Sequence, residues 1–320
     1  MDETIRERVN AKKREIDKYI ELVRVLFTLQ VRFRERYGVS VFVEPTITYE
    51  GKGRKTPDIL VITSSDTALI IDHKYIGTSN VNTVRSQLED IGKYYGTILW
   101  RGKNYKVTHV ILLCNEESWQ NVINVGVYVA KPISLIYEFH EDTMTIKLRI
   151  MVPKDIKIID PFLKRLYNVL KSHRELNLEV PIEESHKYVF IRQEPPEEYI
   201  MDRLYRLLYS LMEYNVDKKP FRIKDIVEYF KQYHPPWVLE RGEAVQFTLG
   251  RIIKGIKLLE KIDLAKYYPK EGIVVVKKIK RLSSPELLDH LLIKLAKYEL
   301  KEEAKIKSKG KQTRLTNFFH

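Results

Sequence analysis

The sequence predicts an α/β protein with two domains: a mixed sheet flanked by helices, then a smaller helical domain that contains a two-stranded hairpin. A chain of 320 residues is longer than one hydrophobic core usually occupies. Its first half alternates one long amphipathic segment with short apolar runs, whereas apolar residues after position 198 recur at helical spacing. We therefore expect a first domain over 1–172, a connector over 173–198, a second domain over 199–300 and a flexible tail over 301–320.

The first domain is predicted from periodicity and turn residues. Apolar residues at steps of three and four indicate a helix over about Thr4–Tyr37, which Gly38 ends. The apolar runs Ile59–Thr63 and Ala68–Ile71 are joined by three polar residues, which predicts a hairpin. The remaining expected elements are strands at 39–43, 46–49, 110–114, 125–129 and 144–151, a turn at 50–55, and helices at about 81–95 and 160–172.

Composition limits the classes of protein that the chain can belong to. The one cysteine, Cys114, excludes an intramolecular disulfide and a zinc site built from several cysteines. Apolar runs stay well short of the roughly 18–20 residues of a membrane helix, so we expect no membrane span, no signal peptide and a cytoplasmic protein. The net charge of +13 favours a polyanionic partner such as nucleic acid.

Three charged residues stand at matching ends of the predicted hairpin. Asp58 begins one strand, and Asp72 and Lys74 end the other. Antiparallel pairing brings these ends together, with Asp72 and Lys74 on one face and His73 on the opposite face. Two carboxylates at close range favour a divalent cation between them, and oxygen ligands without cysteine indicate Mg²⁺ or Mn²⁺. The alternative is a strand edge held by an Asp–Lys ion pair.

Pro57-Asp58 followed by Asp72-His73-Lys74 resembles the PD-(D/E)xK nuclease superfamily. The resemblance covers roughly residues 10–115 and implies a restriction-endonuclease-like mixed sheet with metal-dependent phosphodiesterase activity. It makes Asp58 and Asp72 metal ligands and Lys74 the catalytic lysine. Asp at the second acidic position, where Glu is commoner, is a departure that the family tolerates. A symmetric dimer is compatible with such a fold.

The same resemblance implies further site residues. A glutamate from the first helix often joins the acids, and Glu21 is our first choice, with Glu35 and Glu44 as alternatives. Gln87 and Tyr94 resemble the glutamine–tyrosine helix of RecB-like members, although their spacing is longer than usual. Gln87 is therefore expected to contact the scissile phosphate or Lys74.

The second domain follows the order of a winged helix-turn-helix, with three helices and then a two-stranded hairpin. The expected helices cover 199–214, 223–233 and 244–262, and one more is expected over 284–300. The third helix and the wing carry basic residues that we expect to contact DNA phosphates. A protein–protein module is the alternative. The expected DNA-binding residues are Arg251, Lys254, Lys257, Lys277, Lys278, Lys280 and Arg281.

The C-terminal tail resembles a PIP box, the Q-x-x-L-x-x-F-F motif that docks on the sliding clamp PCNA. Gln312, Leu315, Phe318 and Phe319 fill its defined positions. One helical turn would place Leu315 and both rings on one side as an apolar plug. A tail that folds back on its own domain is the alternative.

Together these features predict a clamp-recruited, Mg²⁺-dependent DNA endo- or exonuclease of replication or repair, of an archaeal type. One alternative is a nuclease-like fold without activity that serves as a DNA- and clamp-binding adaptor. Another is a restriction-type endonuclease with a winged-helix reader.

Overall fold

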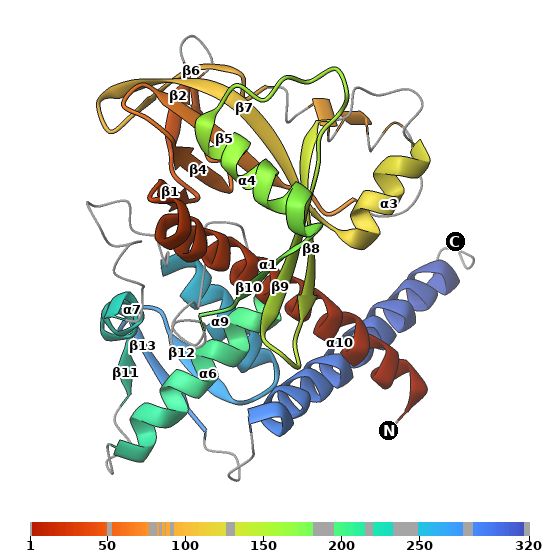
Figure 1. Cartoon of the computed structure of the whole chain (residues 1–320). Coiled ribbons are helices and arrows are strands. Elements are labelled where there is room, and N and C mark those ends of the chain that lie inside the picture. The colour runs from red at the N-terminus through yellow and green to blue at the C-terminus, as the bar shows by residue number, and fades with distance from the viewer. Residues whose placement is uncertain are drawn as a thin grey trace. The chain divides into compact units, whose positions relative to one another are not determined.

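The computed structural model forms two compact units (Figure 1). It describes residues 2–49, 53–76, 82, 85–86, 88–89, 93–125, 132–181, 195–214, 220–232, 249–277 and 284–316. The sheet unit comprises Glu21–Tyr188 and Pro235–Ala244, and the helical unit comprises Met1–Ile20, Val189–His234 and Val245–His320. The boundary at residue 20 falls inside a helix that we expected to belong wholly to the first domain.

That helix is α1, Glu3–Tyr37, close to its predicted bounds. Its buried side chains recur at helical spacing, and Gly38 ends it with φ 67° and an amide that donates to the carbonyl of Arg34 at 3.0 Å. In the sheet unit, the side-chain amide of Gln30 donates to the Val41 carbonyl at 3.0 Å, and the ring of Phe33 packs against that of Phe162.

The centre of the sheet is the predicted hairpin, β4 (Ile59–Ile62) and β5 (Thr67–His73). Strand β1 (Ser40–Val43) pairs antiparallel with β4, and β7 (Lys103–Asn115) pairs parallel with β5. Helical residues at 82, 85–86 and 88–89 lie between β5 and β7 in the chain. The sheet is therefore mixed and flanked by helices, as the sequence predicts.

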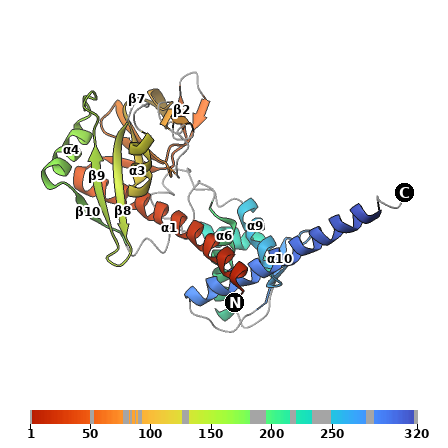
Figure 2. The same cartoon turned by 90° about the vertical axis from the view of Figure 1, so that its right-hand side faces the viewer.

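The long strand β7 carries two extensions of this sheet. Its first half pairs with β6 (Gly96–Trp100), which continues to β2 (Ile47–Tyr49) and β3 (Gly53–Lys55). Its second half pairs with β8 (Ile133–His140), followed by β9 (Thr145–Met151) and β10 (Leu176–Glu179), beside α4 (Pro161–His173) in Figure 2. Asp160 caps α4 by accepting from the Leu163 amide at 3.0 Å.

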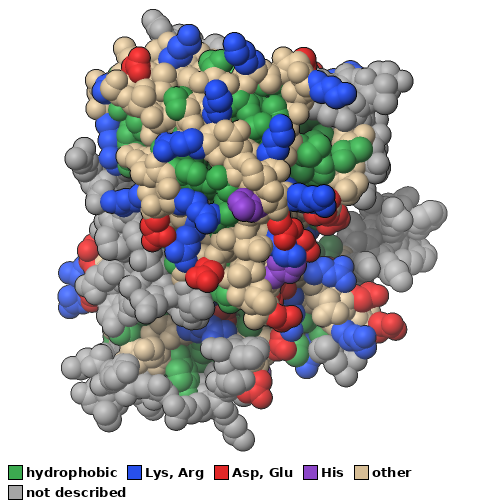
Figure 3. All heavy atoms as spheres, viewed as in Figure 1, with side chains coloured by type: hydrophobic (Ala, Val, Ile, Leu, Met, Phe, Trp, Pro, Cys, Tyr) green, Lys and Arg blue, Asp and Glu red, His purple; other side chains and the backbone are tan. Residues whose placement is uncertain are grey.

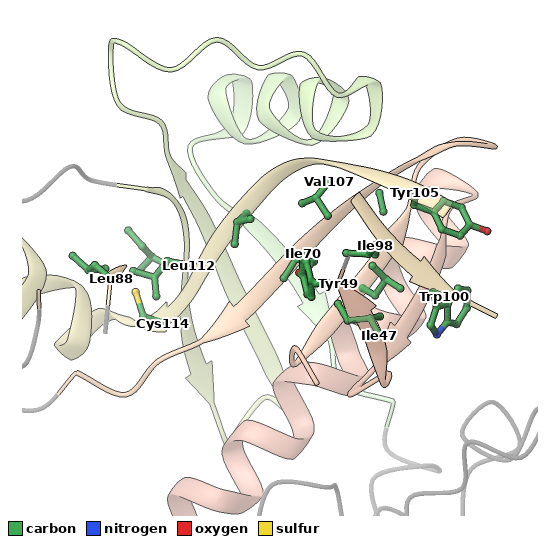
Figure 4. Packing of buried hydrophobic residues seen from close by; sticks show 14 of the residues in the cluster. Ile47, Tyr49, Ile70, Leu88, Ile98, Trp100, Tyr105, Val107, Leu112 and Cys114 are labelled. Carbon is green, nitrogen blue, oxygen red and sulfur yellow. The ribbon is translucent and has the colours of Figure 1, made fainter. Parts of the chain in front are cut away.

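One hydrophobic cluster fills the space between the hairpin and the strands that extend from β7 (Figure 4). Leu60, Ile70 and Leu112 supply it from the central strands, and Ile47 and Tyr49 from β2. Leu60 and Ile70 lie on the strand face that also carries Asp58 and Asp72, because side chains alternate along a strand. The cluster thus defines the face of the sheet on which the acidic residues lie.

Several elements differ from those predicted. Residues 53–55, expected in a turn, form β3, since they pair with β2 in the register Tyr49↔Gly53. Residues 126–129 lie outside the described residues, and Val125, the first residue of that expected strand, ends helix α3 (Glu116–Val125). Strands β6, β8 and β10 were not predicted, and β10 falls within the expected connector.

The helical unit contains α6 (Glu197–Tyr214), α7 (Ile223–Gln232) and α9 (Leu249–Lys261). A three-stranded antiparallel sheet accompanies them, in the order β11 (Phe221–Arg222), β13 (Ile273–Val276) and β12 (Ala265–Tyr268). Gly255 allows α9 to approach α6 closely, because a Cβ there would lie 3.0 Å from the Ile200 side chain. Among the described residues, no helix is long and apolar enough to cross a membrane.

The first part of α1 is held in the helical unit by ion pairs. Lys12 Nζ lies 2.6 Å from Glu198 Oε1 and 3.0 Å from Glu299 Oε1. Arg8 donates to both carboxylate oxygens of Glu303 at 2.8 Å, and Lys13 pairs with Asp289. These contacts explain why residues 1–20 belong to this unit rather than to the first domain.

Residues 301–320 were expected to form a flexible tail. The structure corrects this in part, because helix α10 extends through Ser284–Thr316. Lys and Glu dominate residues 301–311 and favour helix without an apolar face. Lys305 also pairs with Glu302 at 2.7 Å, one turn away. Residues 317–320 lie outside the described part of the chain.

Candidate active site

The hairpin places Asp58 and Asp72 side by side. Ile59 pairs with Ile71, so continuing the antiparallel register by one residue sets Asp58 opposite Asp72, with both side chains on the same face. The backbone amide of His73 donates to Asp58 Oδ2 at 2.6 Å. Asp72 is only 3% exposed. The two carboxylates are therefore drawn together by the strand register itself.

Lys74 joins the acids on this face. Its Nζ lies 2.7 Å from Asp72 Oδ2, and its amide donates to the Leu113 carbonyl at 3.0 Å, which continues the parallel pairing of β5 with β7. Just beyond, the Ser118 hydroxyl of α3 accepts from the Ile76 amide at 3.0 Å. The backbone from Lys74 to Ile76 is thus fixed by hydrogen bonds to β7 and α3.

Glu44, which follows β1, is the third acid near this group. It is 4% exposed, has φ 46°, and its amide donates to the Asp58 carbonyl at 2.7 Å. Burial, then the charge of Asp72 and then that of Glu44 raise the pKa of Asp58 well above its usual range, against the effects of the His73 amide and Lys74. Burial and two neighbouring acids thus make ionisation of Asp58 unfavourable here.

Glu21, our first choice for the upstream acid, lies elsewhere. It hydrogen-bonds Tyr137, whose hydroxyl is 3.2 Å from His73 Nε2. His73 points to the strand face opposite Asp72, so Glu21 belongs to that opposite side. Burial raises the pKa of Glu21 and lowers that of His73 to about 4, which keeps the imidazole neutral. The structure thus groups Glu44, and not Glu21, with the acid pair. Glu35 instead contacts Arg32, at 2.8 Å.

The acid pair satisfies part of what a divalent cation requires. Asp72 Oδ2 is buried and, among the described residues, has no partner with hydrogen-bond geometry, although Lys74 lies close. The described residues contain no group of three or more His, Cys, Asp or Glu side chains that could hold a metal ion. Asp58 and Asp72 would thus supply two oxygen ligands, with water and substrate completing the shell as Mg²⁺ usually allows.

No family model, curated protein or solved structure matches this chain.

Tyr49 of the hydrophobic cluster lies near the acid pair. The Tyr49 hydroxyl donates to the Tyr94 carbonyl at 3.0 Å. Burial, then Tyr94 and then Asp72 raise the pKa of Tyr49, so Tyr49 lies within electrostatic range of Asp72. Gln87, expected beside the scissile phosphate, lies outside the described residues.

The basic residues expected to bind DNA are partly engaged with acids. Lys254 lies 3.7 Å from Glu197, and Lys277 lies 2.5 Å from Asp263. Lys257 is exposed on α9, and Arg251 is half-buried on the same helix. Lys278, Lys280 and Arg281 lie outside the described residues. On the face seen in Figure 3, Lys and Arg side chains are dispersed rather than gathered in one patch.

The clamp motif is only partly described. Gln312 and Leu315 belong to helix α10, whose backbone is described at these positions, but their side chains are not among the described ones. Phe318 and Phe319 lie beyond it. Clamp binding remains a prediction from the sequence.

Proposed function

We propose that the sheet unit is a metal-dependent phosphodiesterase that cleaves DNA, of the PD-(D/E)xK kind. The observation that carries this proposal is the meeting of Asp58, Asp72 and Lys74 on one face of the β4–β5 hairpin. Surface ion pairs do not require two acids to face each other, and the raised pKa of Asp58 is an energetic cost that a binding or catalytic role explains.

The order of elements supports the same reading. Helix α1 precedes the hairpin, helical residues follow it, and β7 then returns parallel to β5. Helices on both sides of the hairpin are what the resemblance to the superfamily requires. The acids also lie at strand ends rather than in the middle of the sheet, and the Lys74 side chain beside Asp72 is 27% exposed.

The residues have separable roles in this proposal. Asp58 and Asp72 would hold Mg²⁺ or Mn²⁺, which when bound lowers the pKa of a coordinated water and neutralises phosphate charge. Lys74, fixed near Asp72, places a positive charge where negative charge grows on the phosphate oxygens during water attack. Glu44 adds negative charge beside Asp58 and orients that residue through the backbone.

DNA and the sliding clamp are the proposed partners. The helices and small sheet of the helical unit follow one another as in a winged helix, whose third helix and wing would contact DNA phosphates. Gln312, Leu315, Phe318 and Phe319 would dock on PCNA. Tethering through the clamp would raise the local concentration of nuclease at DNA without new contacts at the acid pair.

One observation favours the adaptor alternative. The described residues supply two metal-ligand acids rather than three, and Lys74 already neutralises one of them. A nuclease-like unit with this arrangement could bind DNA and the clamp without cutting.

A substrate panel separates the two functions. The purified chain is incubated with labelled single-stranded, duplex, flapped and branched DNA in Mg²⁺, Mn²⁺ or EDTA. The proposal predicts cleavage of at least one substrate that EDTA abolishes. Tight binding with no cleavage of any substrate would establish the adaptor instead.

A pull-down tests the tail separately. Deleting Gln312–His320 should abolish retention on immobilised PCNA, since the motif is removed whole. Unchanged retention would refute the PIP box.

A further inference from the structure

Lys55 of β3 is a cation on the inner side of the sheet unit. It pairs across the strands with Ile47, a fully buried member of the hydrophobic cluster, and opposite residues point to the same side. Arg54, one residue earlier, is exposed on the other side of the strand. Lys55 is therefore the residue of β3 whose side chain lies on the same side of the strand as the cluster.

Two tyrosine rings hold the Lys55 ammonium. Its Nζ lies 5.3 Å from the centre of the Tyr49 ring and 5.1 Å from that of Tyr94, and 3.4 Å from the Lys93 carbonyl oxygen. Both ring distances are within the range of a cation–π interaction. No carboxylate in the described part of the chain forms an ion pair with Lys55. The described contacts of the ammonium are thus with two aromatic rings and a carbonyl oxygen.

The tyrosines that hold Lys55 also connect it to the acid pair. Tyr49 belongs to the same cluster as Ile70, which lies two residues before Asp72 on the same strand face (Figure 4). Tyr49 and Tyr94 are joined by the hydrogen bond described above. Tyr49, which holds Lys55 on one side, is thus within electrostatic range of Asp72 on the other.

We propose that Lys55, held over Tyr49 and Tyr94, binds a backbone phosphate of DNA next to the one that reacts at the acid pair. This assignment rests on the proposed function for its substrate. Half-burial of Lys55 makes the contact stronger than one in open solvent, because the local dielectric is lower. Each phosphate contact also releases condensed counterions, which makes the contact measurable through salt.

The experiment measures binding and not cleavage. Fluorescence anisotropy with labelled DNA in EDTA gives the association constant at 50–200 mM KCl for the full chain, Lys55→Met, Lys55→Arg and Arg54→Met. Lys55→Met keeps the stem over the rings and removes the charge. It should reduce the slope of log K against log[KCl] by about 0.7–0.9, so that affinity falls roughly threefold less over this range. Lys55→Arg should restore the slope, and Arg54→Met should leave it unchanged.

Two results would overturn the proposal. One is a Lys55→Met slope equal to that of the native chain in a variant with native circular dichroism and melting temperature. The other is an equal reduction by Arg54→Met, which would indicate a diffuse charge effect. If the native chain cuts no DNA but Lys55→Met still lowers the slope, hydrolysis is wrong and the phosphate site stands. If the chain cuts DNA and the slope is unchanged, the phosphate site alone is wrong.

Discussion

Replacing Asp58 by Asn should stabilise the folded protein in the absence of divalent cations. The change keeps an oxygen that accepts from the His73 amide and removes the charge that faces Asp72. Burial and neighbouring acids raise the folded-state pKa of Asp58. Below about pH 4 this carboxyl is protonated in folded and unfolded chains alike, so native protein and variant should differ little. As the pH rises, the unfolded chain loses the proton first, and ionisation favours unfolding of the native protein only.

The size of the effect follows from the strand geometry. Side chains directly opposite on antiparallel strands lie about 5 Å apart, and two like charges at that distance repel by about 3 kcal/mol at an effective dielectric constant of about 20. Lys74 and the His73 amide offset part of this repulsion. We therefore expect the variant to gain about 1–2 kcal/mol at pH 7, which is about 2–8 °C in melting temperature for a unit of this size.

Thermal unfolding in EDTA at pH 4, 5, 6 and 7 measures this gain. Asp66→Asn is the matched control, because Asp66 is exposed at the turn of the same hairpin. The Asp58→Asn advantage should grow from near zero at pH 4, whereas the control should stay flat. A variant that melts below the native protein at pH 7, or an advantage that does not depend on pH, would refute mutual repulsion of the acid pair.

Three further outcomes follow from the described contacts. Mg²⁺ at about 100 times its dissociation constant should stabilise the native chain by about 2.7 kcal/mol. Asp72→Asn should lose this gain in a thermal-shift titration, and an unchanged shift would place the metal elsewhere. Glu44→Gln should slow DNA cleavage by about 10–100-fold, and Glu21→Gln should slow it much less, because only Glu44 lies near Asp58. The opposite ranking in single-turnover rates would restore Glu21 as the upstream acid. Gly255→Ala should destabilise the helical unit by about 1–3 kcal/mol in denaturant titrations, because the new Cβ would meet Ile200. Gly250→Ala, at an exposed position of the same helix, should not, and equal effects would contradict close packing of α6 and α9.

The parts of the fold that the sequence predicts are those with a strong local signal. Amphipathic spacing and Gly38 define α1, and Asp160 with Pro161 marks the start of α4. Strand β6 was missed because the turn after it, Arg101-Gly102, has positive φ at both residues. Such hairpin turns usually carry Asn or Asp at the first position, and arginine does not indicate one. Helix α3 did carry a signal: Asn115 accepts from the Ser118 amide at 2.9 Å, as an N-cap does.

The site residues, like the elements of the fold, were predictable only where a local sequence pattern places them. Alternation along a strand was enough to put Asp72 and Lys74 on one face and His73 on the other. The choice between Glu21 and Glu44 depended on which face α1 covers, and that is set by tertiary packing rather than by local pattern. Lys55 was missed because residues 50–55 look like a turn, and its inward direction appears only once β3 is paired with β2.

The rate of DNA cleavage by Asp58→Ala and Lys74→Ala tests the central claim most directly. Single-turnover assays in Mg²⁺ or Mn²⁺ are run on the substrate that the native chain cuts best, and DNA binding is measured in EDTA on the same preparations. The acid pair and its lysine predict a loss of cleavage of at least about a hundredfold in each variant, with binding largely intact. Cutting at the native rate by both variants would contradict the assignment of this site.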